Sequence, residues 1–416
     1  MRVRCGVLFL VLAAAQAAAQ APPRLALKDL VAEALAANPE IAAARARAQA
    51  ARERPAEARS LPDPMVSVGY QSSGNPLPGA GLGSAPTANI GVMASQSLPF
   101  PGKRTLAAAV AAREADAAEA QIDAVRLNVA ARVKEAYYRL SYTYAASDIL
   151  TRNQQLLETL LKVSETRYAA GRAAQQDVIK AQIALSVIEL RLQKLAEERA
   201  TRAGDINALL DRALETPVGR PDDLAPGTVD VAADAIPALV DAHAPALKRD
   251  ALLVARSRTA VDAARLEFKP DFGVTGGYAY MGAMPAMYEL RFDITVPLRR
   301  ERRAAAVAEE THRADEARRE AGADRQALLA RANADYQAAF TSSKLARLYR
   351  DTVLPQARLA YESSLASYQT GSVDFLSVLS SFETVLEYEM TYADELASFH
   401  VAISRLEEAT GATLAQ

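Results

Sequence analysis

The sequence Tyr168-Ala169-Ala170-Gly171 recurs as Tyr368-Gln369-Thr370-Gly371, and this recurrence decides the predicted fold. The two tyrosines lie 200 positions apart (368 − 168). Each copy interrupts a stretch with helical periodicity that is too long for a globular domain. These stretches run from about 102 to 166 in one half and from about 299 to 367 in the other. Such a recurrence indicates an internal duplication, in which each half supplies one copy of the same unit.

The duplication divides the chain into two predicted repeats, 20–215 and 238–416. They are joined by a linker at 216–237 that is rich in Pro, Gly and Asp. Each repeat is expected to begin with a pair of short helices, the second of which starts at a proline, Pro39 or Pro245. Two strands and a long helical hairpin follow. The expected ranges are strands 65–73 and 87–98 with hairpin 102–213, and strands 271–281 and 287–298 with hairpin 299–411.

The N-terminus is organised like a secretory signal peptide, which we place at residues 1–19. Cys5 is the only cysteine and lies in this segment, so we expect no disulfide and no cysteine metal site in the mature chain. The net charge of −2 offers no basic surface for nucleic acid. No later stretch reaches the roughly 18–20 apolar residues of a membrane helix, so we expect strands to make any membrane contact.

The predicted strands alternate between an apolar and a polar face. In the last strand, Phe292 and Ile294 are on the apolar face, and Glu289, Arg291 and Asp293 are on the polar face. An ordinary sheet over a soluble core shows the same alternation. The strand length of about 9–12 residues and the aromatic residues near strand ends favour a membrane barrel. We therefore expect lipid at the apolar face and a water-filled lumen at Glu289, Arg291 and Asp293.

The predicted elements require several copies of the chain. Four strands cannot close a barrel, and lipid does not tolerate open sheet edges, whereas three copies supply 12 strands (3 × 4). A helix of about 65 residues is roughly 100 Å long and must pack against other long helices. Heptads are not sustained, which favours a helical cylinder over a free coiled-coil rod. Within the second long helix, Pro355 is expected to cause a kink or a short break.

The predicted fold class is therefore mixed and mainly α. Long α-helical coiled hairpins in two internal repeats form a helical barrel. The strands contribute four members per chain to a 12-stranded transmembrane β-barrel of a homotrimer.

Two motifs carry a resemblance to a known family. Arg167-Tyr168-x-x-Gly171 followed by Asp177-Val178-Ile179, and Tyr368-x-x-Gly371 followed by Val378-Leu379, resemble the TolC family of outer-membrane efflux proteins. The resemblance covers nearly the whole mature chain. It implies a passive exit duct in the Gram-negative outer membrane with a large periplasmic portion. It also implies two partners, a periplasmic adaptor (membrane fusion) protein and an inner-membrane pump.

A weaker resemblance concerns the substrate. The segment 95–104, Ser-Gln-Ser-Leu-Pro-Phe-Pro-Gly-Lys-Arg, is similar to the strand-to-helix junction of the heavy-metal branch, which exports cations with resistance–nodulation–division pumps. Its counterpart at 295–300 keeps only the proline and basic residues. Metal cations and small toxic organic molecules therefore both remain open as substrates.

The resemblance also implies a functional role for the breaks between the long helices. In the family these turns close the periplasmic entrance and meet the adaptor. The implied channel tip and adaptor contact comprises Arg167, Tyr168, Gly171, Asp177, Tyr368, Gly371 and Asp374. We expect both glycines to have positive φ, which side chains resist. Asp177, repeated threefold, would form a carboxylate ring that admits cations, or it caps the returning helix; both remain open.

A passive duct needs no catalytic residues and no cofactor, and the sequence suggests neither, because its three histidines are scattered. Met281, Met284 and Met287 form a Met-x-x-Met-x-x-Met run in the expected outer loop of the second strand pair. Thioethers suit Cu(I) or Ag(I), although apolar packing of the loop is the simpler explanation.

Two other classes of function compete with the duct. One is a periplasmic coiled-coil adaptor or a structural protein of an export system, and the other is an exported enzyme. An adaptor predicts a domain of short, glycine-rich strands, and an enzyme predicts clustered polar catalytic residues. The sequence contains neither pattern.

Overall fold

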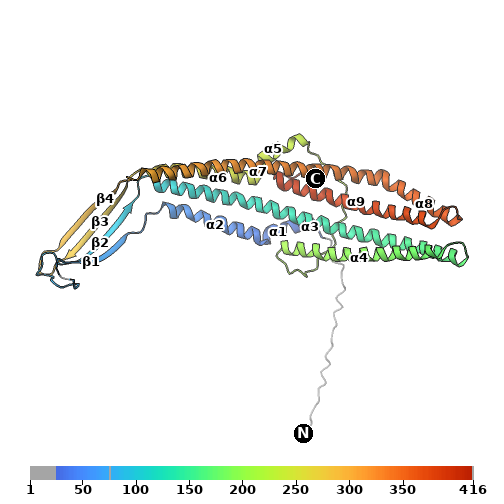
Figure 1. Ribbon diagram of the computed structural model, residues 1–416, viewed down its shortest axis with the longest axis horizontal. Coiled ribbons are helices and arrows are strands. Elements are labelled where there is room, and N and C mark those ends of the chain that lie inside the picture. Colours follow the sequence, from blue (N-terminus) through green and yellow to red (C-terminus); the bar gives the residue numbers. More distant parts are fainter. Residues whose placement is uncertain (1–24, 75, 415–416) are drawn as a thin grey trace, which may run out of the picture.

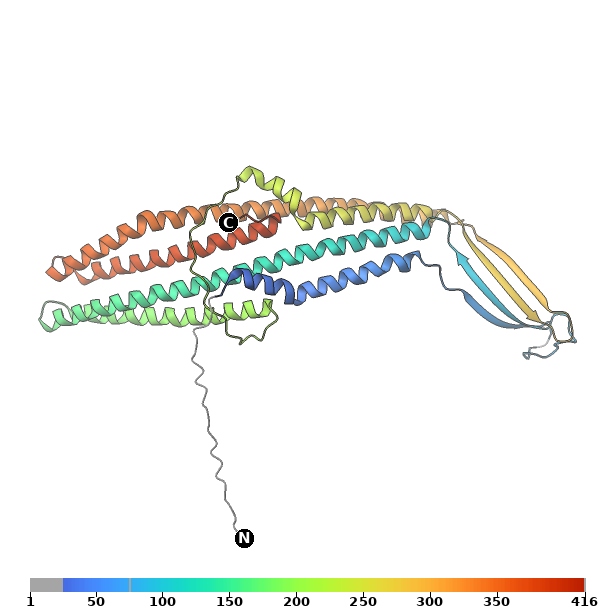
Figure 2. The same ribbon diagram turned by 180° about the vertical axis from the view of Figure 1, so that it is seen from behind.

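A computed structural model describes residues 25–74 and 76–414 as an elongated molecule with long helices along its length and a sheet at one end (Figures 1 and 2). The expected signal peptide at 1–19 lies outside the described residues. None of the helices within these ranges is both long enough and apolar enough to cross a bilayer.

Each repeat has the same order of elements. The first contains α1 (Leu27–Ala37), α2 (Pro39–Arg59), β1 (Met65–Gln71), β2 (Asn89–Leu98), α3 (Lys103–Ala169) and α4 (Gln175–Leu209). The second contains η1 (Ala233–Ala235), α5 (Ile236–His243), α6 (Pro245–Leu266), β3 (Asp271–Tyr280), β4 (Met287–Thr295), α7 (Arg300–Leu348), η2 (Tyr349–Val353), α8 (Leu354–Thr370) and α9 (Phe375–Thr410). The mainly helical fold with four strands matches the predicted fold class.

The strands are shorter than the sequence predicts. The largest difference is in β4, which ends at Thr295 rather than at residue 298. Pro297 has no N–H to continue the ladder, and the N–H of Leu298 instead donates to the carbonyl oxygen of Val296 at 2.9 Å. Conversely, α5 begins within the range expected to be linker, because Pro237 is compatible with the first turn of a helix.

The starts of α2 and α6 lie against the ends of the returning helices α4 and α9. At the start of α2, Asn38 accepts hydrogen bonds from the N–H groups of Glu40 (2.9 Å) and Ile41 (3.4 Å). Its side-chain amide donates to the carbonyl oxygen of Leu209 in the last turn of α4 at 2.9 Å. In the second repeat, Gly411 follows α9 with φ 71°, and a Cβ there would lie 2.4 Å from the carbonyl oxygen of His243. Both junctions therefore place one helix against the end of another.

The break expected at Pro355 is confirmed as a π-helical turn. The turn η2 separates α7 from α8, and Pro355 lies in the first turn of α8. The wider turn accommodates a proline ring that would clash with the preceding carbonyl of a regular α-helix. The path of the chain bends between α7 and α8 (Figure 2).

The long helices bury a shared core where α3, α4, α8 and α9 run together. Leu157, Leu160, Phe375 and Phe382 are at most 2% exposed in this cluster. Burying each such side chain contributes about 1.5–3 kcal/mol, so this packing stabilises the two hairpins as one unit. The core therefore holds the two interhelical turns in a defined relation.

The four strands form one antiparallel sheet in the order β1-β2-β3-β4. The pairing of β2 with β3 joins the two repeats, and the register aligns Val68, Val92, Tyr278 and Tyr288 across the sheet. This register gathers the large aliphatic and aromatic residues of all four strands on one face. Tyr288 is 79% exposed and Phe292 is 72% exposed on that face. An apolar face of this extent on open strands indicates a surface that faces something other than water.

Charged side chains connect the two repeats where the sheet meets the long helices. The Nζ of Lys103 lies 2.9 Å from a carboxylate oxygen of Asp271 and 3.2 Å from one of Glu267. The N–H of Phe100 donates to the other Asp271 oxygen at 2.8 Å. The segment that the sequence singled out at 95–104 therefore anchors the second repeat as well as the first.

Candidate functional site

The two turns between the long helices lie next to each other at the end of the molecule opposite the sheet (Figures 1 and 2). One joins α3 to α4, and the other joins α8 to α9. They come from different repeats, so their proximity is a consequence of how the two hairpins pack. All seven residues predicted for the channel tip lie in or beside these turns.

Both turns use the same backbone motif. Gly171 has φ 67°, and the N–H of Arg172 donates to the carbonyl oxygen of Arg167 at 2.8 Å. Gly371 has φ 84°, and the N–H of Ser372 donates to the carbonyl oxygen of Ser367 at 2.9 Å. The positive φ expected at the two glycines is confirmed. Any residue with a Cβ would be strained at either position.

Arg167 connects the two turns. Its Nη1 donates to the carbonyl oxygens of Tyr368 and Gln369, the second at 3.0 Å. Its guanidinium carbon lies 4.6 Å from the centre of the Tyr368 ring, within range of a cation–π interaction. A single side chain of the first repeat therefore holds the last turn of α8 in the second.

The two tyrosines of the duplicated motif have different environments. Tyr368 is 2% exposed, and its ring packs against Phe375 with centroids 5.8 Å apart. Tyr168, at the matching position of the first repeat, is 48% exposed. The duplication therefore does not extend to tertiary contacts. Tyr168 is free to contact another molecule, whereas Tyr368 is part of the core.

The two acidic residues near the turns also differ. Asp374 is the N-cap of α9 and accepts hydrogen bonds from the N–H (3.0 Å) and the hydroxyl of Ser377. These bonds, together with the positive charge of Lys180, lower the pKa of Asp374. Asp177 lies in the first turn of α4, but the N-cap there is Ala174, which makes no side-chain cap bond. The capping alternative is therefore wrong for Asp177 and describes Asp374 instead.

The carboxylate of Asp177 has no hydrogen bond or ion pair among the residues that the structure describes, and the residue is half-buried. Its negative charge near the N-terminus of α4 is favoured by the helix dipole. A carboxylate without a fixed partner is available to a cation or to another copy of the chain.

The polar face of the sheet carries the residues predicted for the barrel lumen. Arg291 lies between its two acidic neighbours on β4, 3.5 Å from Glu289 and 3.1 Å from Asp293. The register places Thr275 beside Arg291 and Gly277 beside Glu289. Thr275 is 3% exposed, whereas all three charged residues on β4 are exposed.

The predicted methionine run divides between a loop and a strand. Met281 and Met284 lie in the β3–β4 connection, and Met287 is the first residue of β4. Strand parity places Met65, Met93 and Met287 on the polar face, in three successive rows of the sheet. The first two were missed by our sequence analysis, although the same alternation pattern contains them. The described residues hold no cluster of three or more His, Cys, Asp or Glu side chains suited to a metal ion.

Comparison with known proteins assigns part of the chain to a family. Residues 30–211, which are most of the first repeat, match the family of outer membrane efflux proteins. The sequence has no significant match among curated proteins.

Solved channel structures share the fold over nearly the whole chain at low sequence identity. VceC from Vibrio cholerae is 19% identical with a TM-score of 0.79, covering 93% of this chain and 96% of VceC. CusC is 17% identical with a TM-score of 0.77, covering 92% and 91%. The open state of MtrE from Neisseria gonorrhoeae is 18% identical with a TM-score of 0.73, covering 93% and 89%.

The matched family is one of outer membrane efflux proteins, which are channels rather than enzymes. The sheet and the paired turns are at opposite ends of the molecule (Figure 1).

Proposed function

We propose that three copies of this channel form one duct, with a 12-stranded barrel (3 × 4) in the outer membrane and a helical cylinder in the periplasm. The observation that carries this proposal is the sheet. It has two open edges, β1 and β4, and one continuous apolar face. Neither feature is stable in lipid unless the edges of neighbouring copies pair and close the barrel.

The trimer is tested by extracting the full chain from outer membranes with detergent and measuring its mass by native mass spectrometry. We expect a trimer as the folded species, because β1 and β4 each have one edge that pairs with no strand of the same copy. A folded monomer in detergent would contradict the proposal. Extraction without detergent would favour the competing periplasmic adaptor.

The paired turns are the proposed periplasmic entrance and the contact surface for the adaptor, which connects the duct to an inner-membrane pump. The Arg167 bridge supports this role, because it joins the two hairpins of one chain where a closed entrance requires them to stay together. The exposed Tyr168 supports it as well, since an aromatic ring on a turn is suited to a protein contact. The tip proposal therefore comprises Arg167, Tyr168, Gly171, Asp177, Tyr368, Gly371 and Asp374.

Asp177 is proposed to form a ring of three carboxylates at this entrance. Asp177→Asn is expected to weaken block by multivalent cations about tenfold or more, because each neutral amide removes one charge from a site where the charges add. The measurement is single-channel recording in planar bilayers with a trivalent cation on the periplasmic side.

Glu165 provides the matched control, since it is an exposed acidic residue of α3 near the same end. Glu165→Asn should leave cation block unchanged. Equal block in wild-type channel and Asp177→Asn would exclude the ring.

For the substrate, we propose soft metal cations such as Cu(I) or Ag(I). The supporting observation is the position of Met65, Met93 and Met287 on the face assigned to the lumen. Met65 and Met93 are diagonal neighbours across β1 and β2, about 7–8 Å apart and within reach of a shared ion. The segment 95–104, with its similarity to the heavy-metal branch, agrees with this assignment. Small toxic organic molecules are the alternative.

The test is equilibrium binding of Ag(I) to the purified trimer in nitrate buffer. We expect the triple variant Met65→Leu, Met93→Leu, Met287→Leu to lose about tenfold or more in affinity, because leucine preserves the volume but removes the soft ligand. Met390→Leu, in α9 of the helical portion, is the control. Equal binding by wild-type channel and the triple variant would leave organic molecules as the substrate class.

A further inference from the structure

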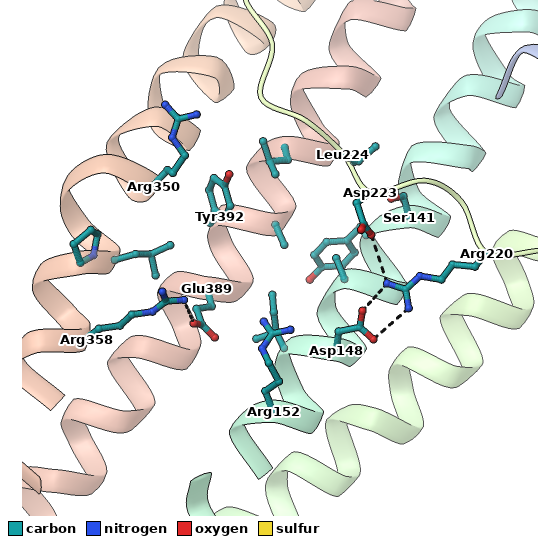
Figure 3. Close-up of a pocket in the computed structure, with 17 residues that line it drawn as sticks. Ser141, Asp148, Arg152, Arg220, Asp223, Leu224, Arg350, Arg358, Glu389 and Tyr392 are labelled. Atoms are coloured by element: carbon teal, nitrogen blue, oxygen red, sulfur yellow. Dashed lines mark hydrogen bonds and ion pairs between the residues drawn. The ribbon is translucent and has the colours of Figure 1, made fainter. Parts of the chain in front are cut away.

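A cavity of 440 Å³ lies between the long helices at the level of the π-helical turn (Figure 3). Its walls are α3, α9 and the start of α8 with η2, and the linker segment 220–224 borders it. All four walls therefore come from one chain. The volume is within the range of about 300–1,000 Å³ that is typical of small-molecule sites.

The acidic side chains that line the cavity already have partners. Asp148 and Asp223 both interact with Arg220, at 2.6 and 3.5 Å. Glu389 pairs with Arg358, and its other oxygen accepts a hydrogen bond from the side chain of Asn153 at 2.9 Å. Because these carboxylates are satisfied within the protein, none of them offers a vacant site for a cation.

One arginine of the lining has no carboxylate partner. The lining contains Arg152, Arg220, Arg350 and Arg358, and Arg350 pairs with Asp351, just outside the lining, at 2.6 Å. Figure 3 shows Arg152 between the Arg358–Glu389 pair and the Arg220–Asp148 pair, without an interaction to either. Across the described ranges of the chain, Arg152 has no ion pair or hydrogen bond from its side chain.

The lining also contains two tyrosine hydroxyl groups. Tyr142 and Tyr392 line the cavity from α3 and α9, and the structure gives neither hydroxyl a hydrogen bond within residues 25–74 and 76–414. Burial raises the pKa of Tyr142, and the nearby negative charges of Asp394 and Glu198 add to this effect. The Tyr142 hydroxyl therefore stays protonated at neutral pH and remains a donor.

The rest of the lining is apolar. It includes Ile149, Leu224, Leu354, Pro355, Ala393 and Leu396. Leu354 and Pro355 belong to the first turn of α8, directly after the π-helical turn. A ligand that satisfies this cavity needs an acceptor group with negative charge and an apolar body.

We propose that this cavity is a binding site for a small organic anion, whose carboxylate or phosphate group accepts hydrogen bonds from Arg152 and the Tyr142 hydroxyl. The apolar body of the ligand would pack against Leu354 and Pro355. Such a ligand joins α3 to the start of α8 across the bend. The site does not depend on the identity of the exported substrate.

The test measures binding of four probes to the purified full-length channel by isothermal titration calorimetry. Benzoate and phenyl phosphate combine an anionic group with an apolar ring, benzamide replaces the charge of benzoate with a neutral amide, and inorganic phosphate lacks the ring. We expect both aromatic anions to bind at least about tenfold more tightly than benzamide and inorganic phosphate. A difference between benzoate and phenyl phosphate would distinguish a carboxylate site from a phosphate site.

Arg152→Gln should reduce the affinity for the preferred anion about tenfold or more, because a charge-assisted donor is replaced by a neutral one. Arg347→Gln is the matched control, since Arg347 is exposed on α7 close to the same bend but does not line the cavity. Tyr142→Phe is the second variant and removes one donor while keeping the ring. Equal affinity for benzoate and benzamide, or unchanged anion affinity in both Arg152→Gln and Tyr142→Phe, would overturn the proposal.

Discussion

Phe292→Arg is expected to prevent assembly of the membrane barrel. Phe292 is 72% exposed on the apolar face of β4, in the middle of the strand. An arginine that faces lipid near the bilayer centre costs about 2–4 kcal/mol, and a trimer carries three of them. The measurement is the fraction of chain recovered as trimer from outer membranes by native mass spectrometry.

Ser67→Arg is the matched control for this prediction. It introduces the same side chain into β1 of the same sheet, but on the polar face, where the register places Ser67 beside Met93. A water-filled lumen accommodates arginine, as it already does at Arg291, so we expect the trimer to form at close to the wild-type yield. Equal losses in both variants, or no loss in either, would contradict the assignment of the two faces.

Arg167→Ala is expected to open the periplasmic entrance. The substitution removes the hydrogen bonds that Arg167 donates to the carbonyl oxygens of Tyr368 and Gln369, and its contact with the Tyr368 ring. Because the side chain is partly exposed, this loss is about 1–3 kcal/mol per chain. Since 1.4 kcal/mol is tenfold in an equilibrium constant, the open fraction should rise about tenfold or more. Planar-bilayer recording measures this open fraction.

Two further variants separate the bridge from a general effect of charge. Arg172→Ala removes an exposed arginine from the same turn, where its backbone groups contact Arg167, and should leave conductance unchanged. Arg167→Lys keeps the charge but not the planar fork that reaches two carbonyls, so it should be intermediate. If Arg167→Ala and Arg172→Ala conduct equally, the bridge does not control the entrance.

The fold was largely predictable because its main signals are local. Strand alternation assigned Phe292 and Arg291 to opposite faces, and the structure agrees because side chains on a strand must alternate. The glycines of the two turns were predictable for the same reason, since positive φ is a property of one residue. Pro355 likewise marked a break from its own covalent structure.

The candidate site was less predictable because its contacts join residues far apart in the sequence. The duplication suggests equal roles for Tyr168 and Tyr368, yet one is exposed and the other is in the core. That difference arises where the two hairpins pack, and the repeat pattern does not encode that packing. For Asp177, the sequence left open whether it caps α4, and the difference there is local: the N-cap of α4 is Ala174, whereas that of α9 is Asp374.

The sequence by itself therefore determined the duplication, the order of helices and strands, the two faces of the sheet and the family resemblance. Each depends on periodicity or on the backbone preferences of single residues. Only the tertiary structure decided that β2 pairs with β3, that Arg167 bridges 201 positions to Tyr368, and that Arg152 enters a cavity beside the π-helical turn. Those contacts depend on how the two repeats pack in space, which no local pattern specifies.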